Sequence, residues 1–113
     1  MRIQVKGRGG ATVDDELRSR VEKKFEKIAR QVSPLAELEI ELKEERNPAI
    51  KDSQIAEATL HLKGVTLRAS ERSPDMSHSI NQMAEDLARQ VKKHRDKRRK
   101  RRESQKPTEP RVA

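Results

Sequence analysis

Each regular segment of this chain carries apolar side chains on one face only. Apolar and polar residues alternate over 37–43 and 56–63, which is the pattern of a half-buried strand. Over 13–32 and 76–94 apolar residues recur every three or four positions, as in an amphipathic helix. Strands and helices with a single apolar face bury it by packing in two layers. The pattern therefore predicts a sheet with every helix on the same side.

The segments follow one another as strand, helix, three strands and helix. The expected strands are 2–6, 37–43, 56–63 and 65–70, and the expected helices are 13–31 and 74 to about 97. Thr12 and Ser73 are typical N-cap residues, Gly7–Gly10 predicts a turn, and Lys63-Gly64 predicts a hairpin. The fold class is therefore α+β: a two-layer β-α-β-β-β-α arrangement, with a four-stranded, mostly antiparallel sheet and two helices packed on one face.

Composition excludes several classes of protein. The 113 residues include no cysteine, so a disulfide scaffold and Cys-ligated metal sites are excluded. Phe25 is the only aromatic residue, so the core must be aliphatic. Apolar residues never occur more than two in a row, which excludes a transmembrane helix and a secretory signal. We expect one small cytoplasmic domain that does not contact membranes.

The positive charge is concentrated in one segment. The chain has a formal net charge of +8, and residues 89–102 alone contain ten Lys or Arg against the single acid Asp96. The remaining residues hold 17 bases and 18 acids and are close to neutral. A cationic segment on a near-neutral body indicates a polyanionic partner, with nucleic acid preferred over anionic lipid. A solvated helix end is the simpler alternative.

Residues that could carry chemistry are few. The three histidines, His61, His78 and His94, fall on separate elements and form no metal-ligand motif. No nucleophile and base can be paired from the sequence. We therefore expect no enzyme activity, no metal, no cofactor and no small-molecule substrate.

The kind of nucleic-acid binding can be narrowed further. Single-strand binders stack bases on aromatic side chains, and this chain has no Tyr or Trp. Contacts from cations to phosphates remain. At 100° per residue, Arg89, Lys92, Lys93 and Lys100 fall within about 100° of arc opposite the apolar stripe, and Lys97 flanks them. In the first helix, Lys23 and Lys27 lie on one side of the stripe and could extend this surface, although pairing within the helix, such as Glu16 with Arg20, explains basic residues there equally well.

Several stretches of the sequence resemble the ribosome hibernation-promoting factor family, which includes ribosome-associated translation inhibitors and sigma-54 modulation proteins. The stretches are Glu57-Ala-Thr-Leu-His-Leu-Lys-Gly, Arg68-Ala-Ser, Asp75-Met76, Ile80 and Leu87-Ala-Arg-Gln-Val-Lys-Lys-His-Arg-Asp-Lys97. The resemblance runs from Arg2 to about Lys97. The chain departs from the family at Ser77, where a Tyr is usual, and at Asn81, where an Asp is common. Arg98–Arg102 is more basic than expected.

The resemblance implies a non-enzymatic translation inhibitor of β-α-β-β-β-α fold. Family members lie between the head and body of the small ribosomal subunit, where they cover the mRNA and tRNA sites in resting or stressed cells. They contact ribosomal RNA through basic residues of both helices. The residues that match or extend this pattern here are Arg89, Lys92, Lys93, Arg95, Lys97, Lys100, Lys23 and Lys27.

The expected organisation is a ribosome-binding domain at 1–97, followed by a basic extension and disordered tail at 98–113. The chain is too short for the dimerisation domain of long family members, so it resembles a short form or the ribosome-binding domain of a long one. We expect a monomer when it is not bound to the ribosome. The alternative function is a regulatory module that binds an acidic protein, and sequence-specific DNA binding is disfavoured because no helix-turn-helix spacing is visible.

Overall fold

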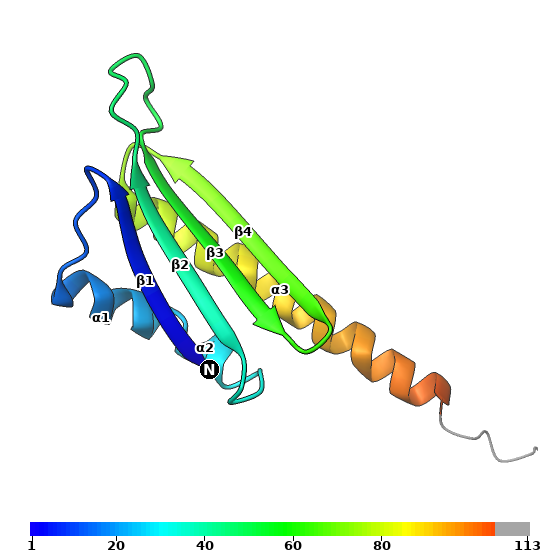
Figure 1. Ribbon diagram of the computed structural model, residues 1–113. Helices are drawn as coiled ribbons and strands as arrows, with labels where there is room; N and C mark the ends of the chain where they lie inside the picture. Colours follow the sequence, from blue (N-terminus) through cyan, green and yellow to red (C-terminus); the bar gives the residue numbers. More distant parts are fainter. Residues whose placement is uncertain (106–113) are drawn as a thin grey trace, which may run out of the picture.

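The computed structural model describes the backbone of residues 1–105 and the side chains of residues 1–100 (Figure 1). Four strands and three helices follow in the order β1, α1, α2, β2, β3, β4, α3. Their bounds are β1 Arg2–Gly9, α1 Asp15–Lys24, α2 Glu26–Ala29, β2 Glu37–Glu44, β3 Gln54–Leu62, β4 Val65–Ser73 and α3 Met76–Gln105.

The strands form one sheet in chain order, β1-β2-β3-β4. β1 and β2 are parallel and are joined through α1 and α2, whereas β2, β3 and β4 are antiparallel neighbours. Lys63 and Gly64 form the predicted tight turn between β3 and β4, and Gly64 has a φ of 80°. The predicted α+β class with a mostly antiparallel sheet is confirmed.

All helices cover the same face of the sheet (Figure 1). α3 packs on β3 and β4, while α1 and α2 lie behind β1 and β2. The core between the layers is aliphatic apart from Phe25. Its fully buried members are Val21, Phe25, Ile28, Leu38, Ile40, Leu42, Leu60, Met83 and Leu87. Apolar side chains from every strand and helix join this core, and burial of these side chains holds α3 on the sheet.

The first helix is divided, whereas the sequence predicted one helix over 13–31. Phe25 lies between α1 and α2 with φ −99° and ψ 3°, outside the helical region. No glycine or proline causes this break. The Phe25 side chain is completely buried, so packing of this large ring in the core outweighs the local preference for a continuous helix. Asp14, not Thr12, caps α1 by accepting a hydrogen bond from the Leu17 amide at 2.8 Å.

β1 continues through Gly7–Gly9, which the sequence placed in a turn. The reason is the parallel partner, because Gly7, Arg8 and Gly9 pair with Leu42, Lys43 and Glu44 of β2. Gly9 has a φ of 64°, and a Cβ atom there would lie 2.5 Å from the Glu44 carbonyl oxygen. Glycine therefore allows β1 to stay paired to the end of β2 and then turn toward α1.

The start of α3 is tied to the sheet by buried hydroxyl groups. Ser79 donates a hydrogen bond to the carbonyl of Gln54 at 2.7 Å, and its hydroxyl lies 2.7 Å from that of Ser73. Ser73 belongs to β4 and does not cap the helix as predicted. Asp75 does so, since its carboxylate accepts from the His78 amide at 3.2 Å. The first turn of α3 is therefore fixed against the start of β3 and the end of β4.

The far end of α3 extends beyond the body of the molecule (Figure 1). Among the side chains of α3 that the structure describes, up to Lys100, Val91 is the last buried one. The 14 residues that follow it add about 21 Å at 1.5 Å per residue. The helix includes Ser104 and Gln105, which the sequence placed in a disordered tail, and the rest of that expected tail, 106–113, lies outside the described residues. The expected domain boundary between 97 and 98 falls inside α3 and remains a prediction.

Candidate nucleic-acid interface

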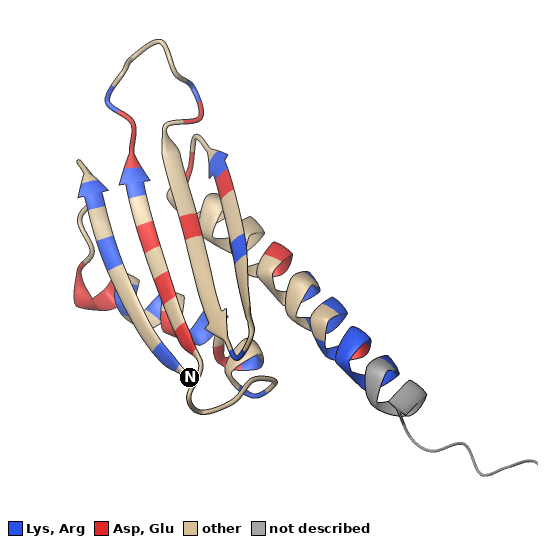
Figure 2. Ribbon diagram, turned by 45° about the vertical axis from the view of Figure 1, so that its right-hand side comes forward, with Lys and Arg blue, Asp and Glu red and all other residues tan. Residues whose placement is uncertain are grey.

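Positive charge gathers on the distal half of α3, as Figure 2 shows. Residues 89–100 contain eight Lys or Arg and one acid, Asp96. The preceding part of the helix, 76–88, has no Lys or Arg and carries Glu85 and Asp86. The helix therefore changes from a segment without basic residues to a strongly basic one at the point where it leaves the sheet. Before that point α3 packs against the core, and from there to residue 100 it presents mainly cations.

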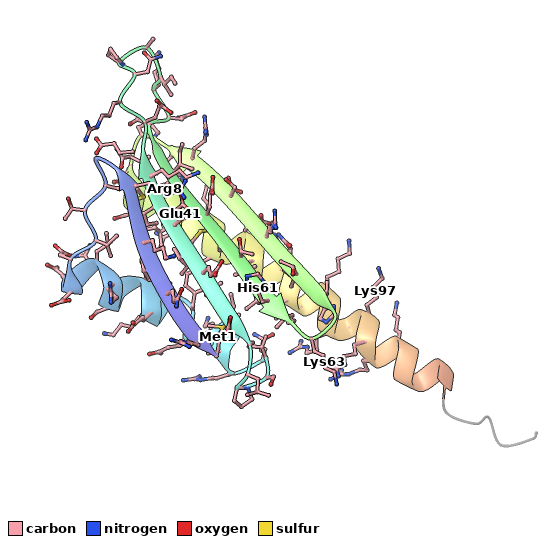
Figure 3. All side chains as sticks on the ribbon, viewed as in Figure 1. Met1, Arg8, Glu41, His61, Lys63 and Lys97 are labelled. Carbon is pink, nitrogen blue, oxygen red and sulfur yellow. The ribbon has the colours of Figure 1, made fainter. Side chains whose placement is uncertain are left out.

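Five of the predicted site residues lie together on the outer face of α3. We name them the basic ridge: Arg89, Lys92, Lys93, Lys97 and Lys100. With Asp96 they line a shallow depression of about 380 Å³. All five are exposed, and Lys97 points away from the sheet (Figure 3). Because one core-facing stripe holds the helix, the opposite side is left to solvent, as the helical spacing predicted.

The basic ridge is poorly neutralised by the rest of the molecule. Arg89 lies 3.8 Å from Asp86, and its side chain is 71% exposed. Within the part of the chain whose side chains are described, Lys92, Lys93, Lys97 and Lys100 have no acidic partner within 4 Å. An exposed pair such as Arg89 with Asp86 contributes about 0–1 kcal/mol and does not cancel the field of the ridge. The ridge can therefore attract and hold an anion.

Arg95 belongs to a different face of α3. Its guanidinium Nη1 donates a hydrogen bond to Oε1 of Gln31 at 3.2 Å, which connects α3 with the segment after α2. Gln31 in turn donates to the carbonyl of Lys27 at 3.2 Å. Arg95 and Lys27 are thus linked through one side chain, but Arg95 is not part of the basic ridge. Helical spacing had left Arg95 outside the arc of basic residues opposite the core, and its place among the RNA-binding residues, which the family resemblance implies, remains a prediction.

Lys23 lies near the opposite end of α3. It shares a hollow of about 260 Å³ with Arg20 and Lys24 of α1 and with Ser77 and Asn81 of α3. Asn81 is eight residues before Arg89, or about 12 Å along the helix axis. Lys23 therefore does not adjoin the basic ridge, and a composite surface of both helices would need a partner that spans this distance.

The uncovered side of the sheet has a different charge pattern. Glu41 of β2 lies 3.0 Å from Nε of Arg8 and 3.5 Å from Lys43, and Lys43 lies 3.3 Å from Glu57 (Figure 3). The Arg8 contact has the geometry of an ion pair and not of an aligned hydrogen bond. His61 is 3.5 Å from Glu39. Glu41 thus lies beside two cations of the same sheet, and no acidic side chain of β2 lines the basic ridge.

Other kinds of site are poorly represented in the described residues. No group of three or more His, Asp or Glu side chains among them could hold a metal ion. No helix in the described part of the chain combines the length and apolarity needed to cross a membrane. What the arrangement offers chemically is a row of ammonium and guanidinium groups that can contact phosphates.

One feature of the site was not predicted. A groove of about 540 Å³ lies where α3 leaves the body, between the segment that follows α2 and the β3–β4 turn. Arg95 and Arg98 of α3 line it together with Leu35 and Lys63. These residues come from three segments far apart in the chain, so no local pattern in the sequence indicates the groove.

Known proteins match this chain over most of its length. The family model described as sigma 54 modulation protein / S30EA ribosomal protein matches residues 3–99. Ribosome hibernation promoting factors of Azotobacter vinelandii and Klebsiella oxytoca are 32% and 33% identical over 97 residues. Those residues are 86% of this chain in both cases, and 86% and 96% of the respective relatives. A ribosome hibernation promotion factor of Staphylococcus aureus is 34% identical over 97 residues, and this chain spans about half (48%) of its length.

Solved structures have the same architecture. A ribosomal subunit interface protein from Coxiella burnetii superposes with a TM-score of 0.67 at 25% identity, over 85% of this chain and 99% of that one. The N-terminal domain of Protein Y from Thermus thermophilus gives a TM-score of 0.69 at 25% identity, over 83% and 99% of the two chains. Together with the family match over 3–99, these likenesses show that the chain belongs to the sigma 54 modulation protein / S30EA ribosomal protein family.

Proposed function

We propose that this protein binds the small ribosomal subunit through its ribosomal RNA and inhibits translation in resting cells, as a hibernation factor in the cytoplasm. The observation that carries the proposal is the basic ridge, a set of exposed cations on a helix that extends beyond the body. The names of the relatives, ribosome hibernation promoting factors and a ribosomal subunit interface protein, support a ribosomal partner.

The protein acts by occupation of a site and not by catalysis. Arg89, Lys92, Lys93, Lys97 and Lys100 contact phosphates of folded RNA, and the two-layer body holds the helix in place. Arg95, Lys27 and Lys23 extend the contact along the side where α1 and α2 lie. With the small subunit occupied over its mRNA and tRNA sites, initiation is blocked until the protein dissociates.

Binding through phosphates has a quantitative signature. If the basic ridge neutralises about five phosphates, the plot of log K against log salt has a slope of about −4. Cosedimentation with purified small subunits from about 50 to 200 mM salt measures this slope. Failure to sediment with small subunits at the lowest salt would refute the proposal.

The alternative function, a regulatory module that binds an acidic protein, is distinguished by nuclease treatment. A complex held by RNA phosphates is lost when the RNA is digested. A complex with an acidic protein survives digestion, and that result would favour the alternative.

A further inference from the structure

The groove at the base of the α3 extension has an apolar floor. We name it the junction groove, and its apolar lining consists of Val32, Leu35, Ala36, Leu62 and Val91. Its volume of about 540 Å³ lies within the range of about 300–1,000 Å³ that is usual for ligand sites. Leu35 is 91% exposed and is the only large hydrophobic residue that is exposed in the described part of the chain. A flat or apolar group placed in the groove would cover Leu35.

The rim of the junction groove is cationic. Lys63 approaches it from the β3–β4 turn, and Arg95 and Arg98 approach it from α3, with His61 and His94 beside them. Glu37 is the one acid among the lining residues. An occupant that complements both the rim and the floor therefore carries negative charge next to an apolar surface.

Arg95 is held in position before any partner arrives. Its guanidinium donates to the neutral amide of Gln31 at 3.2 Å, and its nearest acid, Asp96, is 3.9 Å away. The hydrogen bond orients the guanidinium plane without neutralising its charge. A group fixed in this way loses little conformational freedom on binding. Guanidinium planes also serve as stacking surfaces for unpaired bases in proteins that recognise RNA.

We propose that the junction groove receives one unpaired nucleotide of the RNA that the basic ridge holds. The base lies on Leu35 and the apolar floor, against the plane of Arg95, and its phosphate lies next to Arg98. This inference rests on the proposed function, since it assumes an RNA partner. It adds a preference for an unpaired nucleotide, which phosphate contacts alone do not provide.

The position of the groove favours RNA over an acidic peptide. Arg95 and Arg98 lie in the same two turns of α3 as Lys93, Lys97 and Lys100 of the basic ridge. The groove lies on the body-facing side of α3, since Val91 and Arg98 share the core-facing stripe, so an RNA that contacts the ridge reaches the groove by bending round the helix and needs no second partner. An acidic peptide would have to approach the groove next to a ridge that is already occupied.

The test compares two RNA hairpins of closely matched length. The stem of one is fully paired, and the stem of the other contains a single bulged nucleotide. Affinities for the full-length protein are measured by fluorescence anisotropy at one salt concentration. We expect the bulged hairpin to bind about tenfold more tightly, within the range for a base stacked on a protein surface. Leu35→Ser should remove this preference and leave the affinity for the paired hairpin unchanged. Leu35→Met is the matched control and should keep the preference.

The outcomes separate this inference from the proposed function. Equal affinity for both hairpins, or a preference that Leu35→Ser leaves intact, overturns the inference. If Leu35→Ser weakens ribosome binding but not the bulge preference, the groove holds a ribosomal protein and the inference is also wrong. Failure of the wild-type protein to sediment with small subunits refutes the proposed function instead. A photoreactive base in the bulge should crosslink to the peptide containing Leu35, and crosslinks confined to the basic ridge would contradict the inference.

Discussion

The uncovered face of the sheet and the basic ridge are both exposed and both rich in charge, but the sheet carries acids as well as bases, whereas the ridge is almost entirely basic (Figure 2). On the sheet, register places acids beside bases, as in the chain of contacts from Arg8 through Glu41 and Lys43 to Glu57. These contacts between strands are diagonal, since Arg8 is directly opposite Lys43 and Glu41 is directly opposite Glu57, and long charged side chains can reach a diagonal neighbour about 7–8 Å away. On α3, Asp96 is the one acid among the ridge lysines, and none of these lysines has an acidic partner within 4 Å in the part of the chain whose side chains are described. Charge density alone therefore does not identify a binding surface, because the presence of partners decides whether a charge remains available.

Reversal of charge on the ridge should have the largest effect. Lys92→Glu with Lys93→Glu places two acids where phosphates are expected, and ribosome binding should be lost near physiological salt. The salt slope should shrink by about 2, since about one phosphate contact disappears with each lysine. Cosedimentation over a salt series measures both quantities.

The matched control lies in the loop between β2 and β3. Arg46→Glu with Lys51→Glu makes the same change in net charge at exposed positions, in a loop at the end of the sheet opposite the α3 extension (Figure 1). Binding should remain close to wild type. Equal loss in both double variants would mean that net charge, and not the ridge, governs binding. A missing melting transition in the Lys92/Lys93 variant would contradict the outward placement of these side chains.

Removal of the core contact that holds α3 should lower the stability of the fold and leave the charge of the basic ridge unchanged. Leu87 is completely buried, so Leu87→Ala leaves a cavity and should lower the free energy of unfolding by about 2–5 kcal/mol. The salt slope of the protein that remains folded should be unchanged. Chemical denaturation measures the first quantity. A loss below about 1 kcal/mol would show that α3 packs more loosely than described.

The hydroxyl contacts at the start of α3 should contribute less. Ser79→Ala leaves the buried Gln54 carbonyl without its donor and should cost about 1–3 kcal/mol. Ser77→Ala is the control, because Ser77 lies two residues earlier in α3 and is exposed, and it should be nearly neutral. Since alanine favours the helix more than serine does, similar losses in both variants would show that the effect is not specific to the hydrogen bond of Ser79.

The smallest effect is expected on the uncovered face of the sheet. Glu41→Gln weakens the contacts with Arg8 and Lys43, and the free energy of unfolding should fall by about 1 kcal/mol or less. Ribosome binding should not weaken. Weaker binding of this variant would place the sheet, and not the ridge, against the partner.

The elements were predictable where a single periodicity controls them. Alternation placed Leu38, Ile40 and Leu42 on the buried face, and helical spacing placed Lys92 and Lys93 opposite the core. These assignments succeed because they depend only on local geometry and on burial of apolar groups.

The errors arise where distant residues decide. Phe25 interrupts the first helix because of its packing, and Gly9 stays in β1 because β2 provides a partner. The hydrogen bond from Arg95 to Gln31 joins residues 64 positions apart, so local spacing could not indicate it. The junction groove was missed for the same reason, since its lining comes from three separate segments.

The most direct test of the account places a photocrosslinker on each of the two surfaces. The chain has no native cysteine, so Lys97→Cys on the ridge and Lys6→Cys on the uncovered face of the sheet give single attachment sites with the same loss of charge. With small subunits at low salt, the probe at position 97 should crosslink to ribosomal RNA and the probe at position 6 should not. Crosslinks to ribosomal RNA from position 6 with none from position 97 would contradict the central claim that α3 presents its basic ridge to the ribosome.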